Sequence, residues 1–316
     1  MHSVSKLKRT DSSMLARVRR WLGPRRTDDM GLLGSGLRLL VLLVFGVYFG
    51  LPLLWLLLAP TKTDNQLLGL HPLAFGSFAR VGQAWQNLLI FEHGVVTKWA
   101  TNSVWYTLAS LVLSIVITIP AGYALATAKF AGRSVLLWLT LITMILPGSA
   151  LVLPLFLEMN AVHLVNTPWS VILPAAFFPF GVYLAYIFYS VSLPKDLLAA
   201  GRVDGCSELQ LFWYVGFPLA RSLLGLLTFL SFTANWNNYF LPFVMLNKSQ
   251  LYNLPVGLQA LIIGTTALRP TFATDIPIKR AEVATAGVIL VLPVVLVFLF
   301  SQRFLVSGTL TGVIKE

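Results

Sequence analysis

"SVWYTLASLVLSIVITIPAGYALAT", residues 103–127, is a long run that contains no acidic or basic side chain. A bilayer core is crossed by roughly 20 consecutive apolar residues in a helix. The run is therefore long enough to span a membrane, and it predicts a transmembrane helix. The segments on either side of it decide whether it is one span among several.

The composition of the whole chain is that of a membrane protein. Of its 316 residues, 57% are hydrophobic and 11% are charged, and the mean hydropathy is +0.78. Soluble domains carry about 25% charged residues. Five more apolar segments without a charged residue in their interiors accompany the first, and with it they predict an all-α integral membrane protein with six transmembrane helices: 38–59, 134–156, 170–191, 222–246 and 283–302.

The basic residues predict the topology. With the N-terminus inside, 16 of the 23 basic residues fall on the inner side: nine in the first 38 residues, two after the second span, three between the fourth and fifth, and two at the C-terminus. This bias predicts that both termini are inside, with residues 1–37 as a basic cytoplasmic arm. The net charge of +11 is thus topological and does not indicate nucleic-acid binding. The last outer loop opposes the trend with four basic residues: Lys248, Arg269, Lys279 and Arg280.

Several classes of function lack the residues they need. The chain has no GxxxxGK[ST] phosphate loop, so we expect no ATPase activity and no enzyme. The single cysteine and four scattered histidines predict neither a metal site nor a cofactor in this chain. The span interiors have no ionisable residue, which argues against proton coupling, although a sodium site built from backbone carbonyls stays open. Energy for uphill transport would therefore come from another subunit.

A polar stretch interrupts the apolar pattern between the fourth and fifth spans: "SLPKDLLAAGRVDGCSELQLF", residues 192–212. Ser192 is expected to cap a helix with Pro194 and Asp196 in its first turn. Gly205 suits the left-handed position that ends helices, and Ser207 can cap a second helix. Taken alone, the stretch is equally typical of an ordinary amphipathic connector.

The spacing within this stretch resembles the cytoplasmic "EAA" loop of binding-protein-dependent ABC transporter permeases. That pattern reads Glu-Ala-Ala, three residues, Gly, nine residues, Ile-x-Leu-Pro. Here 199–201 occupies the first three places, Gly205 is the glycine, and 215–218 follows after nine residues. Two departures stand out: Ala199 replaces the glutamate, and Gly201 replaces the second alanine.

The resemblance covers most of the chain after residue 100 and is greatest to the carbohydrate, maltose-permease-like branch. The similar stretches follow in family order: 102–103, 121–133, 144–156, 164–174, 235–243, 255–261 and 292–315. The resemblance implies a type I ABC importer permease fold, with a permease domain over 38–316, a core at about 98–306 and a cytoplasmic coupling helix at 194–205. It places the chain in the bacterial cytoplasmic (inner) membrane as a multi-pass protein.

The resemblance also implies function and partners. The chain would form half of the translocation pathway of an ATP-driven sugar importer, with a second permease subunit, two ATPase subunits that hold ATP and Mg, and an extracytoplasmic solute-binding protein. Coupling would rest on the shape of the helix rather than on the missing glutamate. The residues implied to contact the ATPase are Asp196, Leu197, Ala199, Ala200, Gly201, Arg202, Val203, Asp204, Gly205 and Pro218.

A second polar group is a candidate for the solute path or a gate: Asn235, Trp236, Asn238 and Tyr239. Aromatic faces and amides suit sugar recognition, but asparagines also join membrane helices by hydrogen bonds, and packing is the favoured interpretation for any one of them. No basic residue lies in the spans, so a neutral sugar is preferred over a phosphate ester. The alternatives are a stand-alone secondary carrier or channel for a polar solute, and an assembly or sensor subunit.

Overall fold

The computed structural model describes residues 32–264 and 278–310, so most of the predicted basic arm lies outside the described residues. Within these two ranges all the regular structure is helical. The elements are α2 (Leu32–Leu58), η2 (Ala59–Thr61), α3 (Asp64–Gly69), α4 (Phe78–Ile90), η3 (Phe91–His93), α5 (Val95–Thr127), α6 (Arg133–Ile145), α7 (Gly148–Ala161), α8 (Trp169–Ala176), α9 (Pro179–Ser192), α10 (Lys195–Val203), α11 (Glu208–Leu211), the π-turn η4 (Phe212–Gly216), α12 (Phe217–Leu219), α13 (Arg221–Trp236), α14 (Phe240–Met245), η5 (Ser249–Leu251), α15 (Leu254–Gly264) and α16 (Arg280–Leu310).

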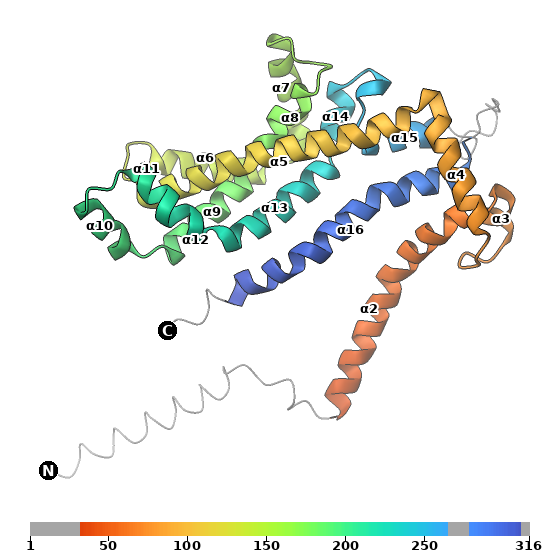
Figure 1. Cartoon of the computed structure of the whole chain (residues 1–316), viewed down its shortest axis with the longest axis horizontal. Coiled ribbons are helices and arrows are strands. Elements are labelled where there is room, and N and C mark those ends of the chain that lie inside the picture. Colours follow the sequence, from red (N-terminus) through yellow and green to blue (C-terminus); the bar gives the residue numbers. More distant parts are fainter. Residues whose placement is uncertain (1–31, 265–277, 311–316) are drawn as a thin grey trace. The chain divides into compact units, whose positions relative to one another are not determined.

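The chain divides into two compact units, of which the first ends at Trp55 and the second begins at Leu56. The described part of the first unit is the apolar helix α2, which carries Pro52 in its interior. In the second unit, α5 packs against α9 and α13, and α13 packs against α16 (Figure 1). The contact between α5 and α9 is close because Gly122 faces Ala185, where an added Cβ would lie 2.4 Å from the alanine Cβ.

In the part of the chain that the structure describes, four helices are long and apolar enough to cross a membrane, and the number rises to six if each of two bent pairs is one span. The six predicted segments correspond to the upper number, and in two of these segments the helix is interrupted. Segment 134–156 is broken into α6 and α7, which meet at 112°. Pro147 explains the break, because a proline keeps the preceding residue out of the helical conformation, and Leu146 is extended.

The fifth predicted segment, 222–246, also differs. Helix α13 ends at Trp236, and the short α14 follows after a break. The apolar helical segment instead extends on the N-terminal side of α13. Residues 208–219 precede α13 there, and the two helices meet at an angle of 74°. Pro218 lies just before this bend and cannot donate a backbone hydrogen bond to the preceding turn.

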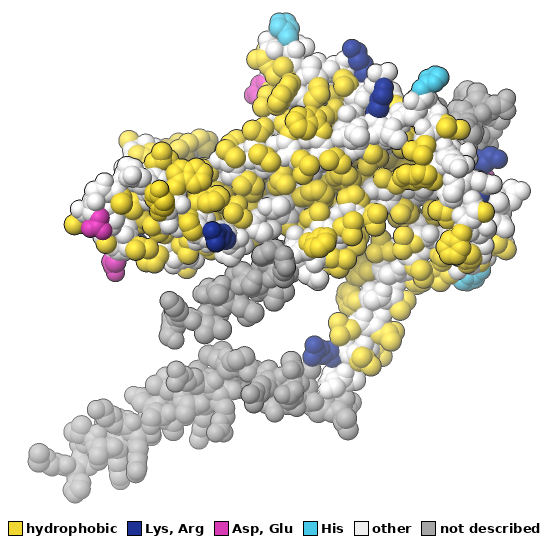
Figure 2. Space-filling view, viewed as in Figure 1, with side chains coloured by type: hydrophobic (Ala, Val, Ile, Leu, Met, Phe, Trp, Pro, Cys, Tyr) yellow, Lys and Arg dark blue, Asp and Glu magenta, His cyan; other side chains and the backbone are white. Residues whose placement is uncertain are grey.

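Two of the chain segments predicted to lie on the inner side, 128–133 and 192–221, lie at one end of the second unit. Helices α5 and α9 end there, α6 and α13 begin there, and α10–α12 lie beyond them (Figure 1). Hydrophobic side chains cover much of the visible face, and acidic side chains appear at that end (Figure 2). Helices α14 and α15 lie toward the opposite end of the unit. Which side of the membrane this end faces stays a prediction.

Three cations near the start of α16 are held by partners within the chain. Arg280, one of the four basic residues that oppose the predicted topology, pairs with Asp64 at 2.5 Å, and Arg80 pairs at 2.6 Å with the fully buried Glu282. Lys62, also buried, donates from Nζ to the backbone carbonyls of residues 71 and 72. The two ion pairs join α3 and α4 to the start of α16.

Candidate functional site

Helix α10 is a short helix with a defined stop, set between the fourth and fifth predicted spans. Ser192 does not cap it, contrary to the sequence prediction: α9 continues through Ser192, and Pro194 takes the N-cap position without a side-chain hydrogen bond. The predicted stop is confirmed. Gly205 has φ +83°, and the amides of Gly205 and Cys206 donate to the carbonyls of Arg202 and Gly201, at 3.2 and 2.9 Å. These two bonds form a Schellman motif.

The second helix starts as predicted, with Ser207 as its N-cap. Ser207 accepts a hydrogen bond from the Gln210 amide at 3.3 Å, and the Gln210 side chain accepts one from the Ser207 amide at 2.8 Å. This capping box satisfies two backbone donors of the first turn. A sequence search for Ser-x-x-Gln would have found Gln210.

One side of this helical pair is buried in the bundle. Leu198, Leu211 and Phe212 belong to a hydrophobic cluster that also contains Tyr123 of α5 and Tyr189 of α9. The Tyr123 ring meets the Phe212 ring edge to face at 5.2 Å. Through this cluster, which also contains Leu223 and Leu227 of α13, α10 is packed against α5, α9 and α13.

The other side of α10 is exposed. Ala199 and Ala200 are exposed, and so are the two acids implied to take part in coupling, Asp196 and Asp204. Leu197 is 50% exposed and Val203 is 87% exposed. Two large apolar side chains next to small ones thus form a surface that no described part of the chain covers.

Gly201 departs from the family pattern, and its close packing explains why a glycine stands here. It is partly buried, and a Cβ at this position would lie 2.6 Å from Cδ2 of the buried Leu211. The methyl group of an alanine would therefore clash with the Leu211 side chain, which packs α11 against the bundle. Glycine destabilises a helix by roughly 1 kcal/mol relative to alanine, and this close contact offsets that cost.

An ion pair that was not predicted from the sequence joins α10 to α11. Arg202 donates from Nε to Glu208 Oε1 at 2.6 Å and from a terminal nitrogen to Oε2 at 3.2 Å, and both side chains are exposed. The Arg202 hydrogen bond lowers the pKa of the Glu208 carboxyl, and the same bond raises the pKa of Arg202, so the pair stays charged near neutral pH. Glu208 escaped attention because it lies outside the motif.

Pro218, the last residue of the motif, follows the π-turn at 212–216 and is partly buried. In this wider turn the Phe217 amide reaches back to the Phe212 carbonyl, which makes room for the proline that follows. Gly216 packs flat against Tyr123, where a Cβ would come within 2.8 Å of the ring, and its carbonyl accepts a hydrogen bond from Tyr189 at 3.1 Å. The motif thus ends in a fixed bend.

The polar group at the end of α13 is largely engaged in internal contacts. Trp236 is buried, donates from Nε1 to the Leu290 carbonyl at 2.8 Å and stacks on Phe232. The Asn235 side chain donates to Ser231 at 3.2 Å, and the Asn238 carbonyl accepts from Asn253 at 2.7 Å.

Tyr239 stacks on Phe243 and stays partly exposed. The contacts of Trp236 favour the packing interpretation for that residue. Tyr239 and the partly exposed amides keep the pathway interpretation as a prediction. Among the residues that the structure describes, no group of three metal-ligating side chains is close enough to hold an ion.

Comparisons with known proteins agree with this geometry. Residues 118–310 match the family model described as "binding-protein-dependent transport system inner membrane component". The arabinooligosaccharides transport system permease protein AraQ of Halalkalibacterium halodurans is 36% identical over 71% of this chain and 76% of its own length. The lactose transport system permease protein LacG of Rhizobium radiobacter is 28% identical over 83% of this chain and 90% of its own length.

A solved structure supports the fold. A chain in the crystal structure of a bacterial ABC transporter involved in the import of the acidic polysaccharide alginate superposes with a TM-score of 0.71. The match covers 85% of this chain and 95% of the other, at 21% sequence identity. At that identity the likeness extends to the fold alone.

Proposed function

Because the chain belongs to the family of inner membrane components of binding-protein-dependent transport systems, we propose that it is a permease subunit forming half of the path for a neutral sugar or oligosaccharide. The family is one of transport components, not of enzymes. Two observations support a neutral sugar: the predicted spans carry no basic side chain in their interiors, and the relatives' names include an arabinooligosaccharide and a lactose system.

Helix α10 is the proposed docking site for an ATPase subunit. The observation that carries this proposal is the two-sidedness of α10: Leu198 is buried in the bundle while Leu197 and Val203 are exposed. A helix that is packed against the bundle on one side and exposed on the other can contact a partner subunit and transmit its movement to the bundle. Closure of an ATPase pair would push on the free side and turn the spans between inward- and outward-open states.

The full importer would contain a second permease subunit, two ATPase subunits with ATP and Mg, and an extracytoplasmic binding protein. In this arrangement the end of the unit that holds α10 faces the cytoplasm, with both termini inside. Asp204 and the Arg202–Glu208 pair would give the docking surface its charge pattern.

A cysteine of the native sequence allows the proposed orientation to be tested by chemical labelling. Cys206 is the single cysteine of the sequence, is exposed, and directly follows Gly205. A membrane-impermeant maleimide should label Cys206 in inside-out vesicles and not in right-side-out ones, and added ATPase subunit should slow the labelling. A Cys206→Ser, Lys248→Cys chain is the matched control and should label from the opposite side. Labelling of Cys206 from outside would overturn the orientation.

A substitution on the free side of α10 tests docking without disturbing the core. Val203→Arg places an unpaired charge in the proposed interface, and about 3 kcal/mol of lost binding corresponds to roughly a hundredfold weaker ATPase association. Leu68→Arg, on the exposed outer helix α3, should leave that association unchanged. Co-purification of the ATPase subunit and ATP-driven uptake in proteoliposomes are the readouts. Solute uptake by the isolated chain, driven by an ion gradient, would instead establish a secondary carrier.

A further inference from the structure

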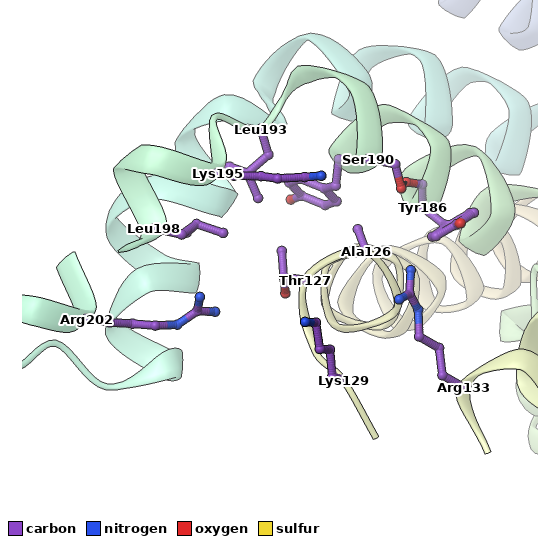
Figure 3. Close-up of a pocket in the computed structure, with 11 residues that line it drawn as sticks. Ala126, Thr127, Lys129, Arg133, Tyr186, Ser190, Leu193, Lys195, Leu198 and Arg202 are labelled. Carbon is purple, nitrogen blue, oxygen red and sulfur yellow. Dashed lines mark hydrogen bonds between the residues drawn. The ribbon is translucent and has the colours of Figure 1, made fainter. Parts of the chain in front are cut away.

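A cavity of about 480 Å³ lies on the bundle side of α10, between the ends of α5 and α9 and the start of α6. Four basic side chains line it: Lys129, Arg133, Lys195 and Arg202. Figure 3 shows Lys195 and Arg202 extending from the α9–α10 side, while Lys129 and Arg133 extend from the α5–α6 side. No acidic side chain is among the lining residues. The cavity therefore concentrates positive charge.

Three of these cations have no anion of their own. Arg202 is paired with Glu208, whereas no ion pair or side-chain hydrogen bond within the described ranges involves Lys129, Arg133 or Lys195. The Nε of Arg133 is buried and has no hydrogen-bond partner, and its guanidinium lies over the Tyr186 ring at 5.9 Å. A buried donor without a partner costs free energy. The site is thus built for an anion that the chain does not supply.

The position of the cavity indicates the source of the anion. It lies where α5 ends at Thr127, α9 ends at Ser192 and α6 begins at Arg133. The ends of spanning helices lie at the level of the lipid headgroups. The wall beside the cations combines apolar side chains, Leu193 and Leu198 among them, with threonine, serine and tyrosine hydroxyls. A free phosphate would use the cations and hydroxyls but gain nothing from the two leucines, whereas a phospholipid would use all of them.

We propose that this cavity binds the phosphate headgroup of an anionic phospholipid, with Lys129, Arg133 and Lys195 as its charge partners. Basic pockets between membrane helices take up such headgroups, and each nearby Lys or Arg contributes about a fivefold gain in affinity. Because Lys195 and Leu198 are on α10, a bound lipid would contact the helix opposite its exposed side. The proposal concerns a structural lipid and does not depend on which solute is carried.

Native mass spectrometry of the tagged, delipidated chain, purified from its host with the subunits it retains, tests the proposal without any variant. Titration with phosphatidylglycerol should give bound lipid at concentrations about tenfold below those needed for phosphatidylcholine. Excess inorganic phosphate should not displace the lipid. Equal binding of the two lipids overturns the proposal, and displacement by phosphate at matched concentration reassigns the cavity to a soluble anion.

Variants then locate the binding. The triple variant Lys129→Gln, Arg133→Gln, Lys195→Gln should bind phosphatidylglycerol on the order of a hundredfold more weakly. The control is Lys98→Gln, an exposed cation near the other end of α5, which should bind as the native chain does. If the triple variant is not recovered in the membrane, the three single variants replace it, each with an expected loss of about fivefold. Native-like binding by these variants, or an equal loss in the control, refutes the assignment.

Discussion

The two ends of the helical unit both carry charge, but they use it differently. At the end predicted to face outward, Glu282 is fully buried, accepts hydrogen bonds from Arg80 and Asn87, and also accepts one from the Lys279 amide. At the end that holds α10, the ion pair Arg202–Glu208 is exposed, and three further cations have no anionic partner among the described residues. The buried charges near Glu282 therefore stabilise the fold, whereas the charges near α10 are the ones we propose to bind other molecules.

The largest effect is expected at the buried outer acid. Glu282→Ala leaves Arg80 buried without its anion, and loss of one member of a buried pair costs about 3–5 kcal/mol. The thermal midpoint of the purified permease complex should fall markedly, with little folded protein recovered. The more exposed pair offers the matched control, because Asp64→Ala breaks Arg280's ion pair at the same end and should cost less. A Glu282→Ala chain as stable as the native one would remove the contrast between the two ends.

A smaller and local effect is expected at the stop of α10. Gly205 has φ +83°, and an L-residue in the left-handed region costs about 1–2 kcal/mol. Gly205→Ala should therefore loosen the Schellman motif, and the amides of Gly205 and Cys206 should exchange faster with solvent. Gly69→Ala, at the end of α3, is the control, because its added methyl meets nothing within 4 Å. Unchanged exchange at both sites would show that the cap of α10 is not needed for its order.

The exposed ion pair should matter least to stability. Arg202→Gln removes a contact between side chains that are 44% and 61% exposed. Exposed pairs contribute about 0–1 kcal/mol, so the thermal midpoint should change little. ATP-driven uptake is the informative second measurement, since the proposed docking surface loses a charge. A loss of stability as large as that of Glu282→Ala would mean that both ends use charge for folding.

The spans and the α10 segment could be predicted from the sequence because their signals are local. Apolar length, the glycine stop at Gly205 and the cap at Ser207 each depend on a few neighbouring residues, and the structure contains all three. Ser192 was assigned wrongly because an N-cap signal cannot show how far the preceding helix continues. The break at Pro147 was not predicted, although a proline inside an apolar run is a local signal for it.

The long-range partners could not be predicted. Arg80 and Glu282 are 202 residues apart, and nothing in either neighbourhood identifies the other. The same limit applies to Trp236, whose partner Leu290 is on α16. The four cations of the cavity come from two chain segments, 129–133 and 195–202, that only the packing of α5, α6 and α9 brings together. Residue types in the sequence indicated candidate functional residues. Only the tertiary contacts show which of these side chains already have partners within the chain.

The departure at position 199 gives the mildest test of the docking surface. Ala199 is exposed, so Ala199→Glu restores the family carboxylate without displacing packed atoms. The new side chain lies one turn before Arg202, a spacing that contributes about 0.2–0.5 kcal/mol when charges are opposite. Stability should therefore hold, and ATP-driven uptake should stay the same or rise. Abolished uptake, with the ATPase still bound, would mean that α10 couples by contacts other than those of the family motif.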